Sequence, residues 1–150
     1  MQMLARYKIA ATVIWMQAFV LVPSVFAAAP GSFDEMITAY SAAHAEKDVA
    51  SLEKLVYWTG VREQEKLQVR KSFSGDISRE IETVKVVDLP ADQVTEYKLA
   101  GITFRPNLKP VKKLVVTFKK QDSTFEVTGS GYLLGQHAGA VYITTAAPVE

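Results

Sequence analysis

Apolar side chains recur with the period of an amphipathic helix from Phe33 to about Lys47. Ser32 and Glu35 have the spacing of a capping box, in which each side chain bonds a free backbone N–H at the helix start. The apolar positions fall three, four, seven, ten and eleven residues after the first, which traces one helix face. They are Phe33, Met36, Ile37, Tyr40, Ala43 and His44. The pattern predicts a first helix with one buried face.

A second helix is predicted from Val49 to about Tyr57, because Asp48 can cap its first turn and leucine and valine occur beyond it at helical spacing. Thr59-Gly60 interrupts the pattern. The interruption separates this short helix from the next one.

A third, more polar helix is predicted from Val61 to Phe73. Leu67 and Phe73 are its expected contacts with the core, and Gly75 is expected to end it because glycine is a poor helix former.

The period changes to that of strands after residue 80. The predicted strands are 81–89, 102–106, 111–120, 124–134 and 140–146, whereas 91–101 fits neither period. Pro90, Pro106-Asn107, "QDS" and "GQHAG" separate them. Helices followed by a run of antiparallel strands predict an α+β fold in which the helices pack in the concave face of a curved sheet.

The first 27 residues have the layout of a secretory signal peptide: a short basic start, a long apolar run and small residues before the cleavage site. Val25 and Ala27 occupy the −3 and −1 positions, and Pro23 precedes them. We therefore expect an exported, periplasmic or extracellular protein with a single domain at 28–150 and no stable membrane span after cleavage. The alternative is an uncleaved anchor, since the run from Ile9 to Ala29 is long enough to cross a bilayer.

Charge and cysteine content exclude several classes of function. The sequence has 17 basic and 16 acidic residues, and residues 1–27 hold two of the bases and no acid, so the expected mature chain is close to neutral. That balance argues against a nucleic-acid partner. The absence of cysteine excludes disulfides and thiolate sites, and the two histidines lack a metal-binding spacing. We expect no metal and no other cofactor.

Tyr57 and Trp58 form an aromatic pair at the end of a predicted helix. Such a pair either lines the mouth of a cavity or packs between helix and sheet. The candidate cavity-lining residues are Tyr40, His44, Tyr57, Trp58 and Glu126. No catalytic residue is assigned.

Six cations and no acid lie between Arg105 and Lys120. Arg105, Lys112 and Lys113 are candidate anion-binding residues, because clustered positive charge attracts anions. The alternative is a solvated edge strand, where lysine prevents pairing with another sheet.

Together, "MITAYSAAHAEKDVASLEKLV" and "TGVREQEKLQVRKSF" resemble the helices of the NTF2-like superfamily, the cystatin-like α+β cone that includes ketosteroid isomerase-like and polyketide cyclase-like enzymes. The resemblance implies that Tyr40 matches a tyrosine that stabilises an oxyanion in the isomerase branch. The branch's general-base aspartate lies on a strand pair between the second and third helices, and here only "LVYW" fills that place. The resemblance therefore implies a cone that lacks the general-base aspartate and is closed by Tyr57 and Trp58.

The leading expectation is non-catalytic binding of a small apolar ligand or a protein partner, with a homodimer formed through the apolar strand Val111 to Phe118. Two alternatives stay open. One is an isomerase or dehydratase that uses Tyr40, His44 and either Glu126 or Asp88. The other is an envelope interaction module that uses the basic strand.

Overall fold

The computed structural model describes residues 28–120 and 128–149, in which three helices precede seven strands. The predicted α+β class, with helices followed by antiparallel strands, is confirmed. The helices are α1 Phe33–Ala45, α2 Val49–Glu53 and α3 Glu63–Asp76. The strands are β1 Ile81–Val87, β2 Tyr97–Leu99, β3 Ile102–Pro106, β4 Pro110–Phe118, β5 Gly129–His137, β6 Ala140–Ile143 and β7 Ala146–Pro148.

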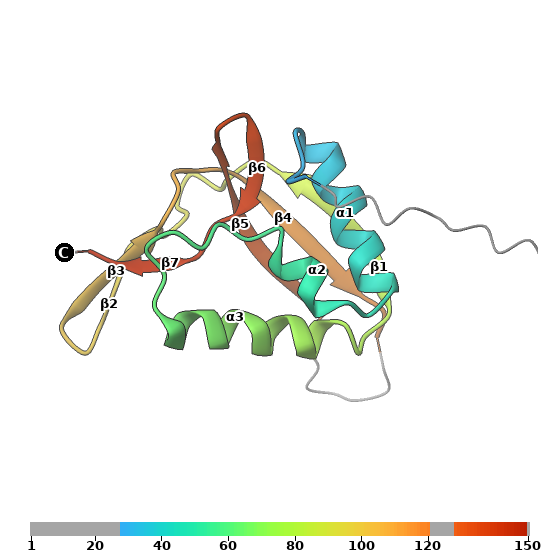
Figure 1. The fold of residues 1–150 in the computed structure, drawn as a ribbon, viewed down its shortest axis with the longest axis horizontal. Coiled ribbons are helices and arrows are strands. Elements are labelled where there is room, and N and C mark those ends of the chain that lie inside the picture. Colours follow the sequence, from blue (N-terminus) through green and yellow to red (C-terminus); the bar gives the residue numbers. More distant parts are fainter. Residues whose placement is uncertain (1–27, 121–127, 150) are drawn as a thin grey trace, which may run out of the picture.

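The strands form two antiparallel sheets, one of four strands in the order β1-β4-β5-β6 and one of three in the order β2-β3-β7. Together they curl as a half-barrel, and the helices lie against one side (Figure 1). Helix α3 begins on the side of the small sheet, which extends from the body of the molecule, and runs below the larger sheet (Figure 1). This arrangement sets α3 opposite the place where the two sheets meet.

The capping box predicted at the start of α1 is present. The Ser32 side chain accepts a hydrogen bond from the backbone of Glu35, and the Glu35 carboxylate accepts one from the backbone N–H of Gly31. Met36 and Tyr40 are fully buried on the predicted apolar face.

Helix α2 ends at Glu53, so the prediction that it extends to Tyr57 is wrong. The chain beyond it pairs with β6 instead: Ile143 donates to the carbonyl of Leu55 at 2.8 Å, and Tyr57 donates to the carbonyl of Ile143 at 3.0 Å. The residues after α2 thus serve as a short parallel bridge to the sheet.

Helix α3 runs to Asp76, so the prediction that Gly75 ends it is wrong. Nothing lies within 4 Å of a Cβ built at Gly75, and the glycine therefore meets no packing limit. Phe73 is fully buried as predicted, but Leu67 is 48% exposed and is not a core contact.

Strand β4 alternates between two environments. Leu114, Val116 and Phe118 are buried in the core beside the helices, whereas Lys113 and Val115 lie on the other face. The apolar residues proposed for a dimer interface are therefore split between the core and the outer face. A dimer through this strand remains a prediction, with fewer apolar residues available to it.

The predicted strand 140–146 is two strands, because β6 pairs with β5 and β7 pairs with β3. Asn107 joins the sheets at the break. Its side-chain NH₂ donates to the carbonyls of Tyr57 at 2.6 Å and Thr59 at 3.1 Å, and its side-chain oxygen accepts from the backbone N–H of Thr145 at 3.0 Å. We call this break between β6 and β7 the seam.

Candidate functional site

A groove of about 530 Å³ lies between α3 and the two sheets. We call it the α3 groove. One wall is α3, the other is the β2–β3 hairpin, and the floor comes from β5 and the seam. Its lining residues are Gln64, Glu65, Gln68, Val69, Ser72, Tyr97, Leu99, Phe104, Tyr132, Ile143, Thr144, Thr145 and Ala146.

The hairpin wall is apolar because of its register. Tyr97 pairs with Phe104 and Leu99 pairs with Ile102, so all four side chains share one face. The Tyr97 and Phe104 rings stack with centroids 5.3 Å apart, and the Arg62 guanidinium lies 5.0 Å from the Phe104 centroid. Leu99 is 63% exposed at the rim, which leaves apolar surface open toward the groove.

The polar lining of the groove is almost entirely uncharged. Among the described residues that line it, Glu65 is the one carboxylate, and Arg62 donates to it from Nε at 3.0 Å as well as from its terminal nitrogen. This hydrogen bond holds the pKa of Glu65 below its ordinary value, so the carboxylate stays ionised and paired. Glutamine, serine and threonine side chains supply the other polar groups.

Tyr132 rises from β5 into the floor of the groove. Its hydroxyl donates to the buried Asp76 carboxylate at 2.6 Å, and its ring packs 5.5 Å from that of Phe73. Burial, with smaller contributions from Tyr40 and Asp76, raises the pKa of Tyr132 well above its ordinary value. Tyr132 is therefore a neutral hydrogen-bond donor that is committed to Asp76.

Tyr40 and His44 lie behind Tyr132 in the core. The ring of Tyr40 is 5.9 Å from that of Tyr132 and 6.3 Å from that of His44. Burial raises the pKa of Tyr40, whose hydroxyl has no hydrogen-bond partner of normal geometry among the described residues. His44 donates from Nε2 to the backbone carbonyl of Asp76 at 3.0 Å. The structure thus brings these two predicted residues together, but neither lines the α3 groove.

Tyr57 and Trp58 lie elsewhere. Tyr57 packs against His137 and Tyr142 at centroid distances of 4.9 and 5.6 Å, and the Trp58 indole donates to the carbonyl of Glu53 at 2.9 Å. Tyr57 thus packs on the β5–β6 hairpin and Trp58 at the end of α2, and both lie outside the groove lining. The fifth predicted cavity residue, Glu126, lies outside the described residues.

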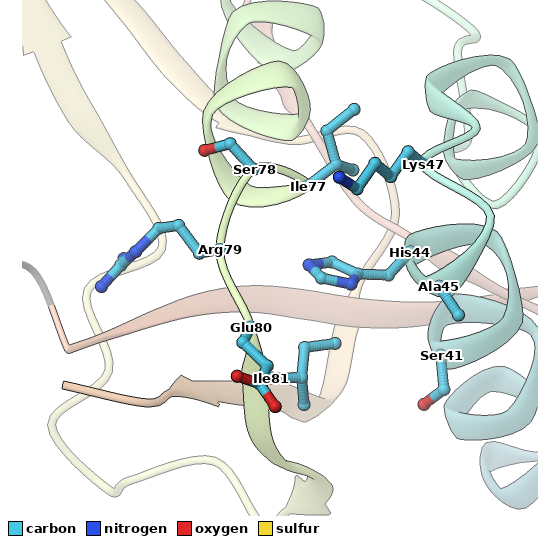
Figure 2. Close-up of a pocket in the computed structure, with 9 residues that line it drawn as sticks. All are labelled: Ser41, His44, Ala45, Lys47, Ile77, Ser78, Arg79, Glu80 and Ile81. Atoms are coloured by element: carbon cyan, nitrogen blue, oxygen red, sulfur yellow. The ribbon is translucent and has the colours of Figure 1, made fainter. Parts of the chain in front are cut away.

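A second cavity of about 460 Å³ lies between the end of α1 and the segment that joins α3 to β1. His44 crosses from α1 toward this segment, the Lys47 amine lies near Ile77, and Arg79 points away from the other labelled side chains (Figure 2). The Arg79 guanidinium lies 4.3 Å from the Phe118 ring centroid, and Glu80 pairs with Lys119. This cavity is bordered by charged groups, in contrast to the α3 groove.

The basic stretch acquires acidic partners from other parts of the chain. Lys112 pairs with Asp88 at 2.5 Å, which also places Asp88 on the surface and outside the groove. Lys113 lies across Gly131, where a Cβ would come within 2.6 Å of its Cε. Arg105 is exposed on β3. The anion-binding role of Arg105, Lys112 and Lys113 stays a prediction.

Three of the groove residues missed by sequence reasoning, Tyr97, Leu99 and Phe104, lie in "YKLAGITF". Ala100 and Gly101 both have positive φ, 49° and 80°, as a two-residue primed turn requires. Asn-Gly would have marked that turn, but Ala-Gly does not. The apolar alternation on each side of it was the available signal.

Within residues 28–120 and 128–149, no group of three potential metal-ligating side chains occurs. In that same part of the chain, no helix has both the length and the apolar character needed to cross a membrane. Comparisons of the chain with protein-family models, with curated proteins and with solved structures find no match.

Proposed function

We propose that this chain is an exported NTF2-like protein that binds a small apolar or amphipathic molecule in the α3 groove without transforming it. One observation carries the proposal: a groove of about 530 Å³ with an apolar hairpin wall, and with polar groups on its floor and opposite wall that are uncharged apart from the paired carboxylate of Glu65. Ligand pockets in proteins have this size and this mixture of surfaces. The helix-first order and the curled half-barrel support the family, and the pattern of residues 1–27 supports export.

The chemistry of the groove lining supports binding without a reaction. General acid–base catalysis requires a titratable group that can exchange a proton with a substrate. Glu65 is held as a carboxylate by Arg62, and Tyr132 is a neutral phenol bonded to Asp76. Neither is free to act as a base, so binding is the function this lining supports.

The test is binding of N-phenyl-1-naphthylamine, an uncharged dye that fluoresces in apolar surroundings. Gln68→Trp places a large ring in the groove from an exposed helix position. We expect it to weaken binding by about tenfold or more, the equivalent of ~1.4 kcal/mol. Ser74→Trp, at an exposed position of α3 outside the lining, is the control and should bind as the unaltered protein does. Equal binding by both variants would refute the proposal.

A further inference from the structure

A smaller cavity of about 230 Å³ adjoins the α3 groove. We call it the seam cavity. The two spaces share Tyr97, Tyr132, Thr144, Thr145 and Ala146 as lining residues. They meet at the seam, where β6 ends at Ile143 and β7 begins at Ala146, so that Thr144 and Thr145 belong to neither strand.

Tyr97 stands between the two spaces. It lines both of them, it is 49% exposed, and its ring is held from one side by the stack on Phe104. A molecule that extends from the groove into the seam cavity therefore passes beside this ring.

Among the described residues, the linings of the two spaces offer no unpaired counter-charge. The residues that belong only to the seam cavity are Val94, Thr95, Pro106, Gly131 and Leu133. In the groove, the single carboxylate of Glu65 is already paired with Arg62. Lys113 belongs to neither lining, but its Cε and its amine nitrogen lie 2.6 and 3.3 Å from the position of a Cβ at Gly131, at the edge of the seam cavity. A charged ligand would lose its hydration here without gaining an opposite charge, which is unfavourable.

We propose that the α3 groove selects uncharged, elongated molecules and that Tyr97 limits their length by closing the way to the seam cavity. This inference rests on the proposed function of the groove and adds the class of ligand and the residue that sets its size.

The charge selection is tested with two dyes on the unaltered protein. N-phenyl-1-naphthylamine is uncharged, and 8-anilinonaphthalene-1-sulfonate has the same aromatic body with one sulfonate added. We expect the uncharged dye to bind about tenfold or more tightly, because the sulfonate must be desolvated without a partner. Equal or tighter binding of the sulfonate would overturn the proposal, and its loss in Lys113→Gln would then locate the anion at the seam.

The length limit is tested by displacing the uncharged dye with straight-chain alcohols of increasing length. Affinity should rise about fourfold per methylene while the chain is being buried, and then level off when the groove is full. In Tyr97→Ala, affinity should level off at a chain length several carbons longer. Tyr97→Phe keeps the ring, so affinity should level off at the same chain length as in the unaltered protein. An unchanged plateau in Tyr97→Ala would overturn the role of Tyr97.

The two failures are distinguishable. If Gln68→Trp leaves dye binding intact, the site is elsewhere and the proposed function fails. If Gln68→Trp blocks the dye but the sulfonate binds equally well, or the plateau does not move, the groove binds ligands and only this inference fails. Circular dichroism checks the fold of each variant, and Tyr97→Leu serves as a second shortened side chain if Tyr97→Ala does not fold.

Discussion

Asn107 is the residue whose removal most directly tests the structural role of the seam. Its side chain bonds three backbone groups that belong to segments 38 to 50 residues away in the sequence. In Asn107→Ala the carbonyl of Tyr57 and the N–H of Thr145 lose their partners. Thr145 is buried, at 7% exposure, whereas Thr59 is exposed and can bond to water.

The free energy of unfolding lost in Asn107→Ala follows from the environments of these backbone groups. A lost hydrogen bond costs about 1 kcal/mol, and a buried backbone group left without a partner costs about 1–3 kcal/mol. The exposed Thr59 carbonyl adds little because water replaces the amide. We therefore expect Asn107→Ala to lower the free energy of unfolding by about 2–3 kcal/mol.

Urea unfolding followed by circular dichroism measures this difference. With a urea dependence of about 1–3 kcal/mol per molar, the midpoint should fall by roughly 0.7–3 M. Asn107→Asp is the matched variant, because it keeps the acceptor for Thr145 but sets a carboxylate against two carbonyls. Its pKa should rise in the folded state, so its destabilisation should be full at neutral pH and should diminish as the pH falls below that raised pKa. A loss below about 0.5 kcal/mol in Asn107→Ala would refute the reasoning.

Three further predictions concern single interactions. Tyr132→Phe should cost about 1.5–3 kcal/mol in urea unfolding, because it removes a donor from the buried Asp76 carboxylate. Gly75→Ala should stabilise the protein by about 0.5–1 kcal/mol, since α3 continues through an open position; destabilisation would contradict that helix boundary. The hydrogen bonds that Ser51 donates lower the pKa of Asp48. Asp48→Ala should therefore destabilise the protein fully above about pH 4, and the destabilisation should shrink as the pH falls through the lowered pKa. Unfolding at pH 7 and pH 3 checks this, and an equal loss at both would count against the cap.

Periodicity predicted the elements whose partners are local. The capping box and apolar face of α1 and the alternation in β4 were predictable because each residue's environment repeats within a few positions. The end of α2 was not predictable, since Leu55 and Tyr57 pair with Ile143, which is far away in the sequence. The break between β6 and β7 has the same cause, because it depends on which neighbour each half of the segment finds.

The site was less predictable than the fold. Sequence reasoning singled out the conspicuous aromatics Tyr57 and Trp58, which the structure places in packing around α2. The groove instead depends on how α3 faces the β2–β3 hairpin, and on an Ala-Gly turn whose alanine hides the usual signal. Side chains from helix α3, both sheets and the seam meet there, and no local pattern contains that arrangement.

The seam also separates two parts of the molecule that differ in how much apolar surface they bury. The four-stranded sheet is anchored by a shared core with the helices, whereas the hairpin of the small sheet keeps Tyr97 and Leu99 half exposed or more. Segments with little buried apolar surface open locally at a lower free energy than the whole domain. We therefore expect the amides of β2 and β3 to exchange with solvent before those of β4. Each such opening would remove the outer wall of the α3 groove, so a ligand bound there as we propose would leave while the rest of the protein stays folded.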